Sequence, residues 1–259
     1  RDVTDTIKLL TTMAGFDARE PLSLQETLPR AESFVPTTLE DGVRIGWMGD
    51  YGGYLATEPG LLDICRGALQ GVETKGAVVE DCAPDFELER LWDTWLTLRH
   101  FAFIDSQPLL KDPTLKSQLK PEFQWEIEGS LGMSAAQIVT ADTARSNWYR
   151  ALMALFDEYD FLALPTAQVF PFDAQTHWPS KINGKPMDTY HRWMEVVIGG
   201  TLAGLPVVNL PAGFDQQGRP IGIQILGPTG RDKAVLEFAL AYEAVTSYLE
   251  QRPSLVTSL

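Results

Sequence analysis

Short apolar runs that alternate with segments of helical spacing constrain the fold of this chain more than any other feature of its sequence. Such near-continuous apolar runs are typical of strands in a sheet that is buried on both faces. Their alternation with helices indicates an α/β architecture. We therefore predict a mixed β-sheet covered by helices on both faces, with strands at residues 43–48, 77–82, 160–164, 206–211 and 221–226.

The first two apolar runs and the segment between them form one supersecondary unit. The runs are "VRIGWM" (43–48) and "AVVEDCAP" (77–84), and residues 60–76 place apolar side chains at helical spacing between them. A crossover of about a dozen residues or more joins parallel strands. We therefore predict a β-α-β unit that contains a parallel pair of strands.

The remaining helices are predicted from the spacing of apolar residues. The long amphipathic segment at 134–158 begins at Ser134, which is its predicted N-cap. Two segments have no sustained period and are predicted to be irregular, namely the connection at 16–42 and the loop at 171–188. The other predicted helices lie at residues 3–13, 60–76, 86–104, 187–204 and 233–249.

Charge and composition exclude several classes of partner. The chain has 259 residues, 44% apolar content and a formal net charge of −14. An acidic surface repels phosphate backbones and anionic lipids, so we expect no nucleic-acid and no membrane partner. No apolar run reaches about eighteen residues and the first residues lack the order of a signal peptide, so we expect a cytoplasmic protein. Cys65 and Cys82 are predicted to be buried thiols.

The sequence holds no motif that would carry chemistry by itself. We find no G-x-S-x-G nucleophile elbow, no H-E-x-x-H zinc motif and no glycine-rich phosphate loop. The histidines lie far apart, without the paired spacing of metal ligands. Ser180 and Lys181 lie in a polar loop where the lysine would stay protonated, which argues against a catalytic pair. We therefore predict no catalytic residue, no metal site and no cofactor in this chain.

Several motifs follow one another in a fixed order. They are Leu-Pro-Thr at 164–166, Ala-Gly-Leu-Pro at 203–206, Pro-Ala-Gly-Phe at 211–214 and Gly-x-Pro-x-Gly-x-Gln at 218–224. In this combination the chain resembles the C-terminal half of the amidase signature family. The opening segment "RDVTDTIKLLTTMAGFDAREPLSL" and the β-α-β unit also resemble that family, so the likeness covers nearly the whole sequence.

The resemblance implies a function that this chain would not perform alone. The family hydrolyses amides through an acyl-enzyme, using a lysine, a bridging serine held by a cis peptide and a nucleophilic serine in a Gly/Ser-rich signature. No position here matches them, and they would precede Arg1. We therefore expect residues 1–259 to be the C-terminal portion of a single amidase-like domain, inactive alone, that supplies half of the sheet and part of the substrate pocket.

The same resemblance implies the partners and leaves two other functions open. The expected partners are a small-molecule amide and the missing N-terminal half of the protein, and a homodimer stays open. The alternatives are a non-catalytic amidase-like binding or assembly subunit, and the A subunit of a glutamine-dependent aminoacyl-tRNA amidotransferase. An upstream lysine strand and serine signature would distinguish the enzyme from the non-catalytic subunit.

The resemblance also places candidate substrate-binding residues. In glutamine-specific relatives an arginine on the long helix contacts a substrate carboxylate, and Arg145 stands at the matching position. Those relatives carry an acidic residue at the position of Met194, so a less polar amide fits better than glutamine. Tyr190, Trp193, Met194 and Val197 would form one apolar helix face, where related hydrolases place the acyl channel. Alternatively, Arg145 would only form an ion pair on the helix surface, and the other four side chains would only pack in the core.

Overall fold

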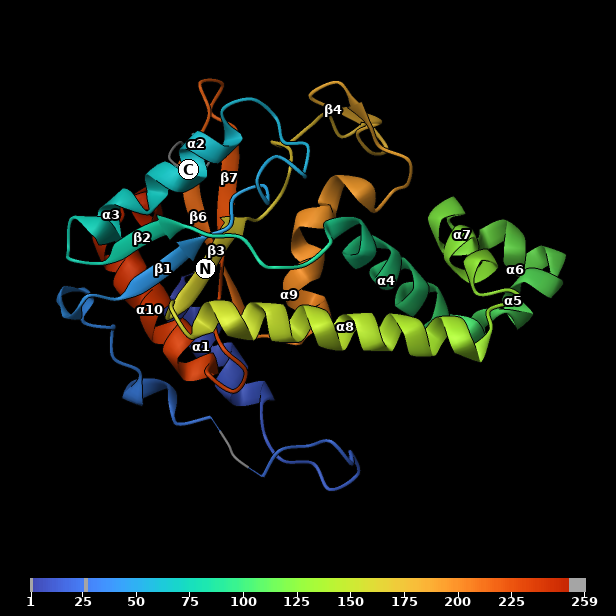
Figure 1. The fold of residues 1–259 in the computed structure, drawn as a ribbon, viewed down its shortest axis with the longest axis horizontal. Helices are drawn as coiled ribbons and strands as arrows, with labels where there is room; N and C mark the ends of the chain where they lie inside the picture. The colour runs from blue at the N-terminus through green and yellow to red at the C-terminus, as the bar shows by residue number, and fades with distance from the viewer. Residues whose placement is uncertain (1, 26–27, 252–259) are drawn as a thin grey trace, which may run out of the picture.

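A mixed β-sheet lies at the centre of the chain (Figure 1). The computed structural model describes residues 2–25 and 28–251 of the 259 residues. Within them, the main sheet has the strand order β2-β1-β3-β7-β6, and every predicted strand is confirmed. The strands are β1 (Arg44–Trp47), β2 (Val78–Asp81), β3 (Phe161–Pro165), β6 (Val207–Phe214) and β7 (Pro220–Leu226).

The sheet combines parallel and antiparallel pairs, as predicted. β1 runs parallel to both β2 and β3, and α2 (Leu61–Ala68) and α3 (Gln70–Glu73) form the crossover between β1 and β2. β7 runs antiparallel to both β3 and β6. The predicted β-α-β unit is therefore confirmed, and β6 forms one edge of the sheet.

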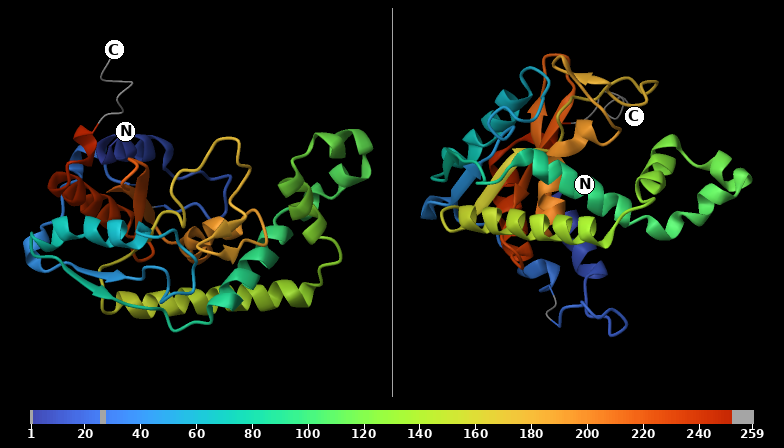
Figure 2. Two further views of the ribbon diagram at one scale, coloured as in Figure 1. Left: turned by 90° about the horizontal axis from the view of Figure 1, so that it is seen from above. Right: turned by 45° about the vertical axis from the view of Figure 1, so that its right-hand side comes forward.

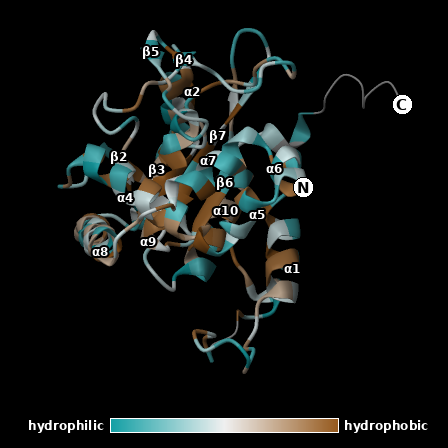
Figure 3. Cartoon of the chain, turned by 90° about the vertical axis from the view of Figure 1, so that its right-hand side faces the viewer, coloured by the Kyte–Doolittle hydropathy of each residue, from teal (hydrophilic) through white to brown (hydrophobic). Residues whose placement is uncertain are grey.

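One face of the sheet packs against α1 (Val3–Met13), α2, α3 and α10 (Asp232–Val245). Phe238 and Tyr242 of α10 are fully buried there, and Phe238 lies 4.6 Å from Phe161 of β3, measured between ring centroids. Figure 3 shows apolar residues, in brown, gathered on the strands and on α10. The hydrophobic contacts of this layer hold the helices to the sheet.

The opposite face packs against α4 (Leu88–Phe101), α8 (Ala135–Phe156) and α9 (Ile198–Ala203). Trp148 of α8 is fully buried and donates a hydrogen bond of 2.8 Å from Nε1 to the carbonyl oxygen of Gly199. A Cβ at Gly199 would lie 2.9 Å from the Trp148 ring, so only glycine permits this close approach. Helices therefore cover both faces of the sheet, as predicted.

The N-terminal end of α8 is fixed as the sequence predicts. Ser134 and Gln137 form a capping box, in which each side chain bonds to the other residue's backbone. Between α1 and β1, the structure describes the 3₁₀ turns Ala31–Ser33 and Leu39–Asp41, while residues 26–27 of the predicted connection lie outside the described residues. No helix among the described residues is both long enough and apolar enough to span a membrane.

Two predictions about the middle of the chain are wrong in part. The segment predicted as a loop at 171–188 contains a hairpin of β4 (Lys181–Ile182) and β5 (Lys185–Pro186), turned by Asn183 and Gly184. The segment predicted as one α-helix at 187–204 begins only at Arg192. It starts as a 3₁₀ helix, η4 (Arg192–Val197), because Met194 leaves helical geometry with φ −118° and ψ 22°.

Short helices project from the sheet between α4 and α8 (Figure 2). They begin with proline at the first helical turn, a position where its missing N–H costs nothing. A further 3₁₀ turn, Ile104–Ser106, connects them to α4. The projecting helices are α5 (Pro108–Lys111), α6 (Pro113–Gln118) and α7 (Pro121–Gly129).

Candidate functional site

The predicted wall residues lie on one short segment, 190–197, beside the end of β3. Trp193, Met194 and Val197 belong to η4, while Tyr190 precedes it in a turn. All four side chains are half-buried. The expectation of one apolar helix face is wrong. Tyr190 lies outside the helix, and the 3₁₀ geometry of η4 directs the side chains within it toward different neighbours.

Trp193 and Val197 contact different parts of the core. Trp193 packs against the small cluster of Val169, Ile182 and Met187, and its ring meets Phe172 edge to face at 5.5 Å. Val197 instead packs against the larger cluster around Trp148. The segment 190–197 therefore bridges the hairpin and the helical layer.

Two buried glutamines hold η4 in place. Gln168, which follows β3, accepts a hydrogen bond from the Val196 N–H at 3.1 Å and donates one to the Ala56 carbonyl at 2.9 Å. Gln224 of β7 donates to the carbonyl oxygens of Pro165 at 2.9 Å and Val196 at 3.2 Å. Because buried polar side chains need such partners, the amides fix the position of η4 against the sheet.

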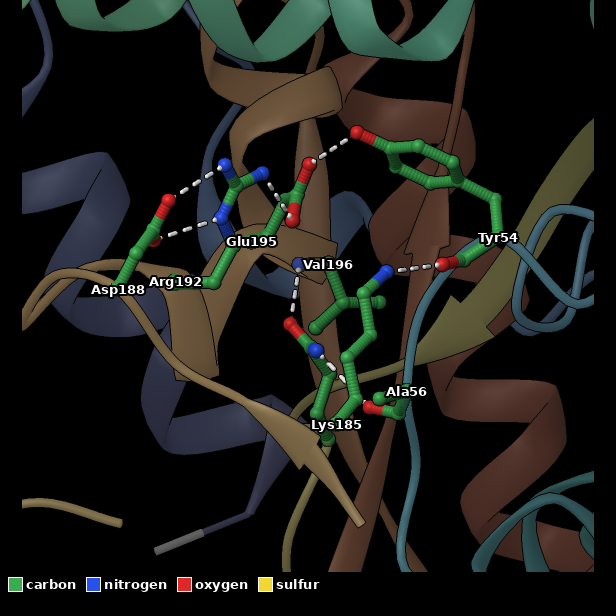
Figure 4. A network of polar contacts seen from close by, with 8 residues as sticks. Tyr54, Ala56, Lys185, Asp188, Arg192, Glu195 and Val196 are labelled. Atoms are coloured by element: carbon green, nitrogen blue, oxygen red, sulfur yellow. Dashed lines mark hydrogen bonds and ion pairs between the residues drawn. The ribbon is translucent and has the colours of Figure 1, made fainter. Parts of the chain in front are cut away.

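A network of charged side chains surrounds the same segment (Figure 4). Glu195 of η4 is 5% exposed, and its oxygens accept bonds from the Tyr54 hydroxyl at 2.9 Å and from Arg192 at 3.1 Å. Arg192 also bonds both oxygens of Asp188, at 3.0 and 3.1 Å, and lies 3.8 Å above the Trp92 ring. Lys185 donates to the Tyr54 carbonyl at 3.1 Å.

Burial and ion pairing act in opposite directions on the two carboxylates. Burial raises the pKa of Glu195, although Arg192 and Tyr54 oppose that rise. The hydrogen bonds from Arg192 lower the pKa of Asp188, which is more exposed. Glu195 was missed in the sequence because its partner Tyr54 is 141 residues away, whereas the spacing of Asp188, Arg192 and Glu195 is a detectable signal.

Glutamine-specific relatives are expected to carry an acidic residue at the position of Met194, and the neighbouring Glu195 does not take its place. Both of its oxygens already accept hydrogen bonds from Tyr54 and Arg192. The side chain is also almost fully buried. The structure therefore shows a bound, structural carboxylate next to Met194.

Arg145 lies in a different cleft from Tyr190. It is exposed on α8, where it forms an ion pair of 2.6 Å with Asp142. Its cleft of about 510 Å³ also contains Arg150 and the last turn of α9, up to Gly204. Tyr190 lines a cleft beside α7 instead. The structure therefore does not bring the predicted carboxylate contact together with the predicted apolar wall.

Two histidines that are distant in sequence meet at one buried acid. Glu126 of α7 is 2% exposed and accepts hydrogen bonds from Arg99 at 2.7 Å and from His191 at 3.0 Å. His100 Nδ1 lies 3.6 Å from the same carboxylate. Within the described residues, no group of histidine, cysteine and acidic side chains has an arrangement that could hold a metal ion.

The thiols and the serine-lysine pair show no sign of activation. Cys65 is buried and Cys82 is half-buried, and burial raises the pKa of each thiol to about 12. A thiol is nucleophilic only as a thiolate, so both side chains are inert at neutral pH. Ser180 and Lys181 are exposed.

Known proteins with similar sequences include an acylamidase and an amidotransferase subunit. The chain is 28% identical over 265 residues to an acylamidase from Rhodococcus erythropolis, covering 98% of this chain and 53% of that protein. It is 28% identical over 277 residues to the A subunit of glutamyl-tRNA(Gln) amidotransferase from a Cyanothece species, covering 98% of this chain and 56% of that protein. The chain therefore spans about half the length of these relatives.

Solved structures show the same fold. A bacterial aryl acylamidase of the amidase signature enzymes aligns with a TM-score of 0.83 and 23% identity, over 98% of this chain and 54% of that one. A 6-aminohexanoate cyclic dimer hydrolase aligns with a TM-score of 0.76 and 17% identity, over 99% of this chain and 56% of that one. The family model for amidases matches residues 1–236. The chain therefore belongs to the amidase signature family.

Proposed function

We propose that this chain is the C-terminal half of an amide hydrolase. It would supply half of the sheet and one wall of the substrate pocket, while a region outside these 259 residues supplies the catalytic lysine and serines. Family membership and the coverage of about half of each relative support this proposal. Serine attack on the amide carbonyl would form the acyl-enzyme and release the amine, and water would then release the acid.

The open outer edge of strand β6 is the observation that carries this proposal. Among the described residues, β6 pairs with β7 alone, and alternate β6 residues, including Val207, are exposed. Beside it lies an apolar cleft of about 310 Å³, lined partly by Leu9 and Met13 of α1, which are 60% and 69% exposed. An open sheet edge with apolar surface beside it can pair with a further strand and be covered by it. We assign the missing half of the domain to this place.

A less polar acyl group suits the wall on η4. Met194 offers no charge to a substrate ammonium, and the neighbouring Glu195 is already held by Tyr54 and Arg192. The half-buried side chains of Trp193 and Val197 are apolar. We therefore propose an aliphatic or aryl amide as the substrate, in preference to glutamine.

Reconstitution tests the proposal. This chain is produced alone and together with an amidase N-terminal region that carries the lysine and the Gly/Ser-rich serine signature. We expect release of amine from an anilide and an aliphatic amide only by the combination, and its loss after treatment with a serine-directed acylating reagent.

Other results would overturn particular parts of the proposal. Hydrolysis by this chain alone would contradict the division of the catalytic machinery. A marked preference of the combination for glutamine would favour the amidotransferase subunit, whose relatives are similarly close. A folded combination without any amidase activity would favour the non-catalytic subunit.

A further inference from the structure

A cleft of about 360 Å³ lies between α7 and the segment that leads into η4. Its volume falls within the range of small-molecule sites, which is about 300–1,000 Å³. One wall of the cleft is α7, which belongs to the projecting helices and lies away from α1 (Figures 1 and 2), and the cleft shares no lining residue with the cleft beside β6. The cleft is therefore separate from the apolar cleft beside β6.

Aromatic rings form much of the wall of this cleft. Trp125 comes from α7, Trp178 from the loop before β4, and Tyr190 from the turn before η4. All three side chains are half-buried, so each is held by packing and keeps part of its surface open. The faces of such rings carry negative potential and attract cations within about 6 Å.

Two carboxylates complete the wall. Glu122 lies at the start of α7 and Asp188 lies before Tyr190, whereas no lysine or arginine is among the described residues that line the cleft. The hydrogen bond with His177 lowers the pKa of Glu122, and the hydrogen bonds from Arg192 lower the pKa of Asp188. Both acids are therefore ionised at neutral pH.

The cations near these acids leave negative charge in the cleft. Arg192 bonds Asp188 but also bonds Glu195, so one positive charge is shared by two carboxylates. Glu122 contacts His177, an exposed side chain that also lines the cleft. Lys120 precedes α7 and its charge reaches Glu122, but its side chain does not line the cleft.

We propose that this cleft binds a small organic cation, an ammonium group with apolar substituents. The aromatic rings would contact the substituents and the charge, and Glu122 and Asp188 would compensate it. The cation could arrive as a free molecule or as the amine-bearing end of an amide substrate, and the two sources share this chemistry.

Binding is tested on the 259-residue chain with choline as the probe and 3,3-dimethylbutanol as its uncharged isostere. Saturation-transfer NMR on the probe detects weak binding even when a protein associates. We expect saturable transfer to choline and weaker transfer to the isostere. Equal transfer to both compounds, or none to choline, would overturn the proposal.

Variants locate the binding. Trp178→Ala should weaken choline binding roughly 2- to 30-fold, the range of a lost cation–π contact. Glu122→Gln should weaken it with little change of shape, which keeps the test independent of any folding defect in the tryptophan variant. Glu128→Gln is the matched control, because Glu128 lies on the same helix and pairs with Lys116 outside the cleft. Unchanged binding in both cleft variants would contradict the assignment.

A second arm distinguishes the two sources and rests on the proposed function. In the reconstituted amidase, Trp178→Ala should lower kcat/KM for an amide that bears a trimethylammonium group more than for its neutral isostere. If the substitution affects both amides equally and the natural chain binds choline, the cleft is assigned to a free cation. If the reconstituted combination with the natural residue at 178 hydrolyses neither amide while the chain still binds choline, the result would count against the proposed function and leave the cleft assigned.

Discussion

Glu195 places a charge inside the core, next to the residues proposed to contact substrate. Its carboxylate is bonded to Tyr54 and to Arg192, whose side chain is 20% exposed. Removing one member of such a group leaves the others without partners in a region that excludes water. The stability of the segment 190–197 therefore depends on this carboxylate.

Replacing Glu195 should test that dependence. We expect Glu195→Ala to lower the free energy of unfolding by about 2 kcal/mol, because the Tyr54 hydroxyl and Arg192 lose their shared acceptor. Urea denaturation measures the change. The control is Glu128→Ala, whose exposed ion pair should contribute less than about 1 kcal/mol. Equal effects of the two substitutions would contradict a structural role for Glu195.

The wall residues should control which acyl groups are accepted. In the reconstituted amidase, Met194→Ala or Trp193→Ala should alter the preference among acyl groups by roughly 10- to 200-fold per site, as expected when a hydrophobic pocket loses methylene-scale contacts. The ratio of kcat/KM values for a short and a long acyl amide measures this. Arg145→Ala should leave that ratio unchanged, since Arg145 lies in another cleft, and act chiefly on amides that bear a carboxylate. A flat profile in both wall variants would remove η4 from the pocket.

At the scale of elements, α8 is the longest helix described and its start is closed by Ser134 and Gln137. Ser134→Ala should lower the free energy of unfolding by about 1 kcal/mol, because one orphan N–H at the helix start loses its acceptor. Ser146→Ala within the same helix should change stability little, since alanine is the better helix former. Thermal unfolding of both variants gives the comparison, and a smaller effect at 134 than at 146 would contradict the capping role.

Glu126 joins α7 to α4 and to the segment before η4, and this contact should depend on pH. Burial raises its pKa, but the hydrogen bonds from His191 and Arg99 outweigh that effect, so its pKa lies below the ordinary value of 4.5. Folding therefore favours the ionised form, and its contribution is complete above the unfolded pKa and lost as the pH falls through the folded pKa. The stability difference between the natural chain and Glu126→Gln should therefore be constant above about pH 6 and shrink as the pH falls below about 5. Urea titrations at several pH values measure it, and a constant difference would refute the linkage.

The elements show which features a sequence can and cannot reveal. The Asn183–Gly184 pair has positive φ values of 46° and 80°, a known hairpin signal that could have identified β4 and β5. The prolines at the start of α5, α6 and α7 likewise indicate helix starts. In contrast, η4 could not be distinguished from an α-helix, because the spacing of its apolar residues fits either kind of helix and the backbone break at Met194 has no local sequence signal.

At the scale of the whole molecule, the inner strands β1, β3 and β7 were predictable because they are apolar runs buried between two helical layers. The edge strands β2 and β6 are more exposed, and the apolar residues within them indicated where they lie. The meeting of His191 with Glu126 was not predictable, because it depends on how α7 folds back toward η4. The predicted wall residues do lie on one segment, yet Arg145 and Tyr190 lie in separate clefts. The spacing of apolar residues in the sequence therefore predicted the sheet and its helical layers. Which distant side chains come into contact depends on long-range packing, which the spacing does not show.

The open edge at β6 predicts how the chain behaves on its own. We expect it to self-associate through β6 and the apolar surface of α1, and Leu9→Asp to reduce that association by placing a charge in the cleft. Val139→Asp is the control, because Val139 is similarly exposed, at 65%, but lies on α8. Sedimentation velocity measures the association. A natural chain that stays monomeric would contradict the role assigned to this surface.

The bonds of Gln168 and Gln224 have a consequence for how such proteins diverge. The side-chain amides of Gln168 and Gln224 form hydrogen bonds to backbone atoms of Val196 and Pro165. These bonds fix the position of η4 whichever side chains stand at 193, 194 and 197. Mutation can exchange those side chains one at a time while the segment stays in place. Descendants of one ancestor can thus come to carry different side chains along this segment without altering the sheet that holds it.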